Sequence, residues 1–298
     1  MTPALVAAVA AATTALLVWA LIGPLTRHGV IDVPAGRSLH VVPTPRGGGL
    51  GVLLVVLLLP LGTLAAGGVA VEDQHGLLLA ALLAIGGLGI LGFLDDLRTL
   101  SVRSRLLAQF AVGIAWALPA VASTGGRWAW VPVVVCLVVA LANVTNFMDG
   151  ANGLVALHGA VASGWYLVVG SHEGQPAVVL LAATALGGAV GFLPFNWPVA
   201  RVFLGDVGSY TFGALWAVLS SWLVLTGTSV VVAAAPLLVL VSDTMVTMVR
   251  RALRGERPTD AHRSHVYQRL VASGWPHTRV AALSRYRARN PFPSAPSK

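Results

Sequence analysis

Charged residues are scarce in this sequence of 298 residues. Asp, Glu, Lys and Arg make up 10% of it, whereas 56% of the residues are hydrophobic. A soluble globular domain carries about 25% charged residues. The shortage of charge therefore excludes a soluble domain and indicates a protein that lies in the membrane along its whole length.

Cysteine is nearly absent as well. The single Cys136 lies within the apolar run 131–143. One thiol excludes an intramolecular disulfide and a thiol-rich metal site. We interpret Cys136 as a small packing or lipid-facing residue.

Long apolar runs, in contrast, fill the chain. A helix needs about 20 apolar residues to cross a bilayer. The runs that approach this length are 5–22, 50–69, 77–94, 106–122, 128–144, 154–169, 177–195, 207–225 and 229–248. The sequence thus predicts an all-α, polytopic membrane protein with about nine transmembrane helices. Because no repeat or linker divides it, residues 1–289 are expected to form a single transmembrane domain, followed by a Pro- and Ser-rich, disordered tail at 290–298.

The basic residues set the expected orientation. If the N-terminus is outside, every Lys and Arg except Arg127 falls on the inner side of the spans. Cytoplasmic loops carry such an excess of Lys and Arg. Topology therefore explains the net charge of +8, although basic proteins often bind nucleic acids. We expect an outside N-terminus, a cytoplasmic C-terminus and no nucleic-acid partner.

Acidic side chains collect at the inner ends of the predicted spans. Asp95 and Asp96 end the third span, Asp149 lies between the fifth and sixth, and Asp206 begins the eighth. Ionisable groups at lipid depth are costly and mark functional sites. Carboxylates supply the hard oxygen ligands that Mg²⁺ prefers, and guanidinium groups bind phosphate oxygens. Carboxylates from separate loops, with arginines around them, favour a site for a divalent metal and a polyphosphate.

The adjacent pair Asp95-Asp96 also has a simpler interpretation. Two like charges at the end of an apolar helix need a cation nearby, and Arg98 follows at once. Arg103 and Arg105 are further candidate partners, or plain anchors on the positive side of the membrane. The spacing alone leaves the structural and the functional interpretation open.

Two connecting segments add polar candidates. The segment 29–49 contains Arg37, His40 and Arg46, and the three glycines after Arg46 let the backbone approach a ligand closely. An ordinary connector into the second span is an equally good interpretation. In the segment 143–154, Asn143 and Asn146 share a helix face, which Asp149 continues. Amides at this density are costly near lipid unless they bind something polar, and helix breaking is the alternative.

Two histidines near the C-terminus form a further pair. His262 and His265 share one side of a helix, if a helix forms there. Such a pair can ligate a transition metal or contact phosphate. Because no cysteine is available to complete a zinc site, we favour phosphate or substrate contact, with a plain surface role as the alternative.

Together these segments resemble one family, the polyprenyl-phosphate N-acetylhexosamine-1-phosphate transferases, which include enzymes that begin peptidoglycan and O-antigen assembly. The similar segments follow the family's order: 37–40 with 43–49, then 93–98, 143–154, 195–209 and 262–268. The last two are most similar to the branch that acts on O-antigen-type sugars. Two features depart from the family: Asn152 stands where an aspartate is usual, and the basic, then Pro-rich stretch 279–298 stands where a further apolar span is common.

The resemblance implies a reaction and a set of residues. The enzyme would transfer an N-acetylated sugar-1-phosphate from a UDP-sugar to undecaprenyl phosphate or another polyprenyl phosphate, releasing UMP, at the cytoplasmic face of the bacterial membrane. Mg²⁺ is the implied cofactor, with Mn²⁺ as a possible substitute, and a homodimer is compatible. The implied catalytic residues are Asp95, Asp96, Asp206, His262 and His265. The implied substrate contacts are Arg37, His40, Arg46, Asn143, Asn146, Asp149, Asn152 and Arg263. The implied metal ligands are Asp206, Asp96 and Asp149.

Two rival functions make different predictions. An ion-coupled transporter holds its essential charges near the middle of the membrane, whereas here the acids lie at the ends of spans. A phosphatidyl-type transferase would be expected to concentrate its aspartates in one compact helical motif, whereas these come from separated loops. The sequence favours the sugar-phosphate transferase, with the transporter as the alternative.

Overall fold

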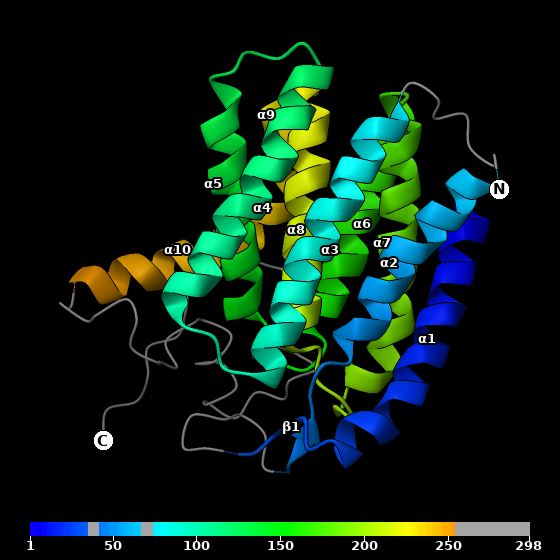
Figure 1. The fold of residues 1–298 in the computed structure, drawn as a ribbon, viewed down its shortest axis with the longest axis vertical. Helices are drawn as coiled ribbons and strands as arrows, with labels where there is room; N and C mark the ends of the chain where they lie inside the picture. The colour runs from blue at the N-terminus through cyan, green and yellow to red at the C-terminus, as the bar shows by residue number, and fades with distance from the viewer. Residues whose placement is uncertain (35–41, 67–73, 254–298) are drawn as a thin grey trace, which may run out of the picture.

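The computed structural model describes residues 1–34, 42–66 and 74–253, which fold almost wholly into helices (Figure 1). The helices are α1 (Pro3–Arg27), α2 (Gly49–Ala65), α3 (His75–Leu97), α4 (Val102–Ser123), α5 (Trp130–Met148), α6 (Leu154–His172), α7 (Pro176–Asn196), α8 (Gly205–Leu225), α9 (Val230–Ala234) and α10 (Leu238–Leu253). Two short strands, β1 (Ile31–Asp32) and β2 (Thr44–Pro45), pair antiparallel. The predicted all-α architecture is confirmed.

Eight helical stretches among the described residues are long and apolar enough to cross a membrane. They are α1, α3 to α8, and the stretch Val230–Arg250. Helix α2 is apolar but shorter, with 17 residues. Each apolar run found in the sequence therefore has a helical counterpart, and the prediction of a multi-pass membrane protein is confirmed.

The last apolar run is not the single straight helix that its composition suggests. A 3₁₀ turn at Ala235–Leu237 divides it into α9 and α10. The turn contains Pro236, which lacks the N–H that a continuous helix would use there. Figure 1 shows α10 lying across the direction of the bundle rather than along it, and α10 packs against α5.

Helix α8 forms the centre of the bundle. Nearly all of its residues are buried, and it packs mainly against α3, α5 and α2. Its Gly213 lies where an added Cβ would meet the α5 backbone at Ala142 at 2.7 Å, so the small residue permits close helix packing. Helix α1, in contrast, faces mostly outward and packs chiefly on α7. This arrangement carries the first turn of α8, with Asp206, into the protein interior.

Successive helices alternate in direction, so their connections gather at two ends of the bundle (Figure 1). The connections α3–α4, α5–α6 and α7–α8 meet at one end, together with β1 and β2. The N-terminus lies at the other end. Asp95 and Asp96 lie in the last turn of α3, Asp206 lies in the first turn of α8, and Asp149 lies in the α5–α6 connection. Because all four are at this end of the bundle, we call it the aspartate end and the other the opposite end.

Candidate active site

Asp96 ties the end of α3 to the start of α8. Its Oδ1 accepts a hydrogen bond from the backbone N–H of Asp206 at 3.1 Å, and its Oδ2 accepts one from Val207 at 3.0 Å. The first N–H groups of a helix have no partner within the helix, and a carboxylate there also interacts favourably with the helix dipole. Asp96 is only 3% exposed, so this bond pair anchors α8 from a distant part of the sequence.

Two glycines make this close approach possible. Gly205 begins α8 with a φ of +75°, and an added Cβ would lie 2.6 Å from Asp96 Oδ2. In α3, a Cβ on Gly92 would collide with the backbone carbonyl of Asp206. A side chain at either position would push α3 and α8 apart.

Asp95 takes one partner from α4 and one from the connection between α3 and α4. Its Oδ2 pairs with Arg105 Nη1 at 2.8 Å, and its Oδ1 accepts the backbone N–H of Leu100 at 2.8 Å. The buried Tyr210, one turn along α8 from Asp206, lies near Arg105. Of the three arginines that the sequence offered, Arg105 is thus the one that compensates this charge.

Arg46 attaches the loop between α1 and α2 to the end of α3. Its Nη2 donates to the backbone carbonyl of Asp96 at 2.7 Å, and its Nε lies 3.8 Å from Asp96 Oδ1. Backbone bonds from Gly48 to Phe203 and from Phe203 to Pro45 join this loop to the α7–α8 connection. The glycines after Arg46 therefore help to join these two connections, in addition to any contact that they make with a ligand.

Helix α5 contributes amides to the cluster. Asn146 Nδ2 donates to Asp206 Oδ1 at 2.6 Å and lies 3.2 Å from Ser209 Oγ. Asn143 Nδ2 donates to Gln109 Oε1 on α4 at 2.7 Å. Both amides lie on the polar face that their spacing predicted, and they hold α5 against α8 and α4.

Asp149 follows the last residue of α5. Desolvation raises its pKa well above the usual range, and the negative charges of Asp206 and Asp96 raise it further. Asp206 in turn lies close enough to Asp96 and Asp95 for their negative charges to interact. The carboxylates of α3, α8 and the α5–α6 connection thus form one crowded group, whose mutual repulsion a bound cation would relieve.

The α5–α6 connection is fastened to the α7–α8 connection. Asn152 Nδ2 donates to the carbonyl of Pro198 at 3.3 Å, and Asn196 Oδ1 accepts the N–H of Gly153 at 2.7 Å. Asn152, which departs from the family's usual aspartate, therefore holds two connections of the aspartate end together.

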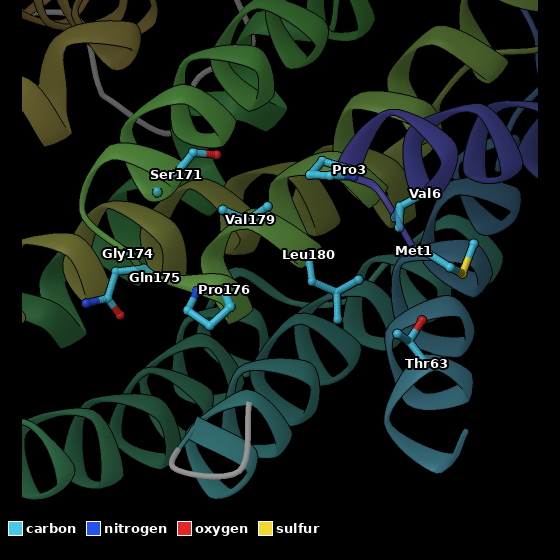
Figure 2. Close-up of a pocket in the computed structure, with 12 residues that line it drawn as sticks. Met1, Pro3, Val6, Thr63, Ser171, Gly174, Gln175, Pro176, Val179 and Leu180 are labelled. Carbon is cyan, nitrogen blue, oxygen red and sulfur yellow. The ribbon is translucent and has the colours of Figure 1, made fainter. Parts of the chain in front are cut away.

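The opposite end of the bundle has a different character. A cavity of about 330 Å³ lies there. Its lining residues include Met1, Val6, Thr63 and Leu180, from the region of α1, α2 and α7 (Figure 2). The side chains of the described residues that line it include no Asp, Glu, Lys, Arg or His. The cavity therefore has no carboxylate that could hold a metal ion, and the aspartate end is the candidate active site.

Comparisons with known proteins indicate the family. A model of glycosyl transferase family 4 matches residues 78–224. The chain is 28% identical to a probable undecaprenyl-phosphate N-acetylglucosaminyl 1-phosphate transferase of Bacillus subtilis, over 93% of this chain and 81% of the relative. It is 27% identical to a decaprenyl-phosphate N-acetylglucosaminephosphotransferase of Mycobacterium tuberculosis, over 91% and 77%. It is 31% identical to a phospho-N-acetylmuramoyl-pentapeptide-transferase of Desulforudis audaxviator, over 94% and 93%.

The chain belongs to glycosyl transferase family 4. The match to the Desulforudis audaxviator protein, which covers almost all of both chains, decides this. The family resemblance inferred from the sequence motifs is therefore confirmed. The finer assignment to an O-antigen-type branch stays a prediction.

The structure brings together a large part of the predicted glycosyl transferase site. Asp95, Asp96, Asp206, Arg46, Asn146 and Asp149 gather at the aspartate end, with Asn143 and Asn152 beside them. Arg37, His40, His262, Arg263 and His265 lie outside the described residues, and their roles stay predictions.

Three residues of the cluster were not among the predicted site residues. Arg105 was considered only as a charge partner, and Gln109 and Tyr210 were passed over as parts of apolar runs. A signal existed for the first two, because Arg105 and Gln109 are four apart and so lie on one face of α4. Tyr210 likewise follows Asp206 by four residues on α8.

The carboxylates fit a metal ion only in part. Among residues 1–34, 42–66 and 74–253, no three His, Cys, Asp or Glu side chains are grouped so that they could hold a metal ion. Mg²⁺, however, is usually held by one or two carboxylates together with substrate phosphates. Asp206 and Asp149 fit this role. Asp96 fits it less well, because both of its oxygens already accept backbone hydrogen bonds.

Proposed function

We propose that the protein transfers an N-acetylated sugar-1-phosphate from a UDP-sugar to polyprenyl phosphate, with undecaprenyl phosphate as the expected carrier, and releases UMP. This reaction would initiate the synthesis of a cell-surface glycan. One observation carries the proposal: Asp95, Asp96 and Asp206 from two helices meet Arg46 and Arg105 at one end of the bundle.

The cluster supplies what phosphoryl transfer needs, which is charge neutralisation and positioning. The phosphate oxygen of the carrier attacks the β-phosphorus of the UDP-sugar, and the bond to the UMP oxygen breaks. Arg46, whose side chain is 37% exposed, is placed to bind phosphate oxygens as a charged hydrogen-bond donor. Because the carrier phosphate is largely ionised at neutral pH, Asp95 need not remove a proton from it.

The proposal includes Mg²⁺ as a cofactor. Asp206 and Asp149 would hold it, and the ion would neutralise the diphosphate charge. Asn146 would then orient the Asp206 carboxylate through its 2.6 Å hydrogen bond.

A site at one end of the bundle suits this pair of substrates. The polyprenyl carrier stays in the bilayer, whereas the charged UDP-sugar stays in water, so the reacting groups meet at the interface. The distribution of Lys and Arg supports the cytoplasmic face as that interface. A transporter would need its charges deep in the spans, and the family membership and the placement of the aspartates argue against it.

The test is a transfer assay with purified protein. A panel of radiolabelled UDP-N-acetyl sugars is incubated with undecaprenyl phosphate, with Mg²⁺ and with EDTA. We expect labelled lipid and an equal amount of UMP in the presence of Mg²⁺, and neither with EDTA. A folded protein that forms no labelled lipid from any donor would overturn the proposal.

A further inference from the structure

Gln109 is a fully buried amide in the middle of a transmembrane helix. It is 0% exposed, and its Oε1 accepts a hydrogen bond from Asn143 Nδ2 at 2.7 Å across the α4–α5 contact. Arg105 lies one turn before Gln109 on α4, and Asn146 lies one turn after Asn143 on α5. The pair therefore lies directly beside the aspartate cluster, on its membrane side.

The atoms of the two amides are fixed by chemistry. Asn143 Nδ2 also lies 2.7 Å from the backbone carbonyl of Val139, which can only accept. The Asn143 atom in this contact must therefore be its nitrogen, and the Gln109 atom that faces the same nitrogen must be an oxygen. Both N–H groups of the Asn143 amide are then used inside the bundle.

These contacts leave Oδ1 as the remaining polar atom of the Asn143 amide. Oδ1 carries no hydrogen and can therefore only accept a hydrogen bond. Asn143 is half-buried, so any further hydrogen bond that this side chain makes is one that Oδ1 accepts. A UDP-sugar carries N–H and O–H groups that can use such an acceptor. An ionised polyprenyl phosphate carries none.

A glutamine at position 109 costs more free energy than an apolar residue would, if packing were its only role. Its Nε2 is buried and has no hydrogen-bond partner among the described residues, although leaving a buried donor unpaired is costly. An apolar side chain of the same length would fill the space without this cost. Packing therefore does not explain the amide, whereas orientation of Asn143 does.

We propose that Gln109 is a positioning residue that locks the Asn143 amide so that its oxygen accepts a hydrogen bond from the nucleotide-sugar. This rests on the proposed transfer reaction and deepens it. Gln109 itself touches no substrate, and its effect passes through Asn143.

The experiment compares variants in the transfer assay, with KM measured separately for the UDP-sugar and for undecaprenyl phosphate. In Gln109→Met, which keeps the length but not the amide, we expect the KM for the UDP-sugar to rise about tenfold, as for a lost hydrogen bond. The kcat and the KM for the lipid should change less than about twofold.

A double-mutant cycle separates positioning from general support. In an Asn143→Ala background, Gln109→Met should change the KM for the UDP-sugar by less than about twofold. The matched control is Trp116→Phe, which removes another buried bond from α4, 2.9 Å from Trp116 Nε1 to Ser221 Oγ and two turns from Gln109. Its KM values should stay within about twofold of the wild type.

Each other outcome counts against the inference. If Gln109→Met changes both KM values equally, lowers kcat alone, or adds its full effect to Asn143→Ala, the positioning role is wrong. If Gln109→Met does not fold in detergent, Gln109→Leu replaces it under the same criteria. A wild-type protein that transfers no sugar-phosphate would instead overturn the proposed function, and this inference with it.

Discussion

The two ends of the helix bundle are built differently, although the same helices form both. At the aspartate end, Asp96, Arg46, Asn146 and Asn196 join connections that are far apart in sequence. At the opposite end, side-chain bonds such as that from Gln74 Nε2 to Gln175 Oε1 border cavities of about 330 and 1060 Å³. At the aspartate end these hydrogen bonds and ion pairs fix the backbone, as expected where catalytic groups must be held in position.

Neutralising Asp206 should lower transfer activity far more than neutralising an acid at the opposite end, and this is the largest effect that we expect. In Asp206→Asn we expect transfer activity to fall by at least about a thousandfold, because the charge that would hold Mg²⁺ is lost. Glu173→Gln at the opposite end is the matched control, since it also neutralises one acid. Activity is measured as labelled lipid, and membrane insertion by fractionation. Normal turnover in Asp206→Asn would disprove the metal assignment.

Two glycines near opposite ends of α3 allow the two ends of the bundle to be compared within one helix. Gly92→Ala places a methyl group against the Asp206 carbonyl, and we expect a loss of about 1–3 kcal/mol in stability from overpacking. Displacement of Asp206 by about 1 Å should lower activity about a hundredfold.

Gly76→Ala, at the other end of α3, is the control for Gly92→Ala. An added Cβ there meets nothing within 4 Å. We expect unchanged activity and up to about 1 kcal/mol of added stability from helix propensity. Equal effects of the two substitutions on the melting temperature and on transfer would refute the difference between the ends.

Asn146 should have a smaller effect, because it acts through Asp206. Asn146→Ala removes the 2.6 Å hydrogen bond to the carboxylate. Loss of such a supporting bond typically lowers metal affinity or activity about 10- to 100-fold, so we expect higher Mg²⁺ concentrations to restore part of the rate. Cys136→Ala on the exposed face of the same helix should leave Mg²⁺ dependence unchanged. A Mg²⁺ titration of both variants checks this.

The change in stability of the metal-free protein on substitution of Asp149 should be the smallest of these effects, and it should depend on pH. Since the pKa of Asp149 is raised in the folded protein, the native state binds more protons than the unfolded state, and the metal-free protein should become less stable as pH rises through that pKa. Asp149→Asn should weaken this dependence and raise the melting temperature at neutral pH by about 2–4 °C. Melting curves in EDTA across pH test it, and a lower melting temperature for the variant would contradict the predicted sign.

Local patterns predicted much of this molecule. The apolar runs located every long helix, because a chain in lipid must satisfy its backbone hydrogen bonds within each segment. The motifs and the distribution of acids located the aspartate end. The bend before α10 was missed, although Pro236 marked it, because apolar composition does not report the direction of a helix.

Several contacts of the site could not be predicted in this way. Asp96 as the anchor of α8, Arg105 as the partner of Asp95 and Gln109 as the partner of Asn143 all join residues from different helices. The sequence around each residue does not show which helices pack against each other. Arg98 and Arg103 were as plausible as Arg105 until α4 was placed against α3.

The sequence by itself determined that this is a polytopic membrane protein of glycosyl transferase family 4 whose aspartates lie at the ends of spans, since composition and ordered motifs are local properties. Only the tertiary structure decided how the partners pair. The close approach of α3 to α8 at Gly92 and Gly205 lets one carboxylate cap the next helix while another pairs with α4. The contact between α3 and α8 depends on packing between segments that are more than a hundred residues apart.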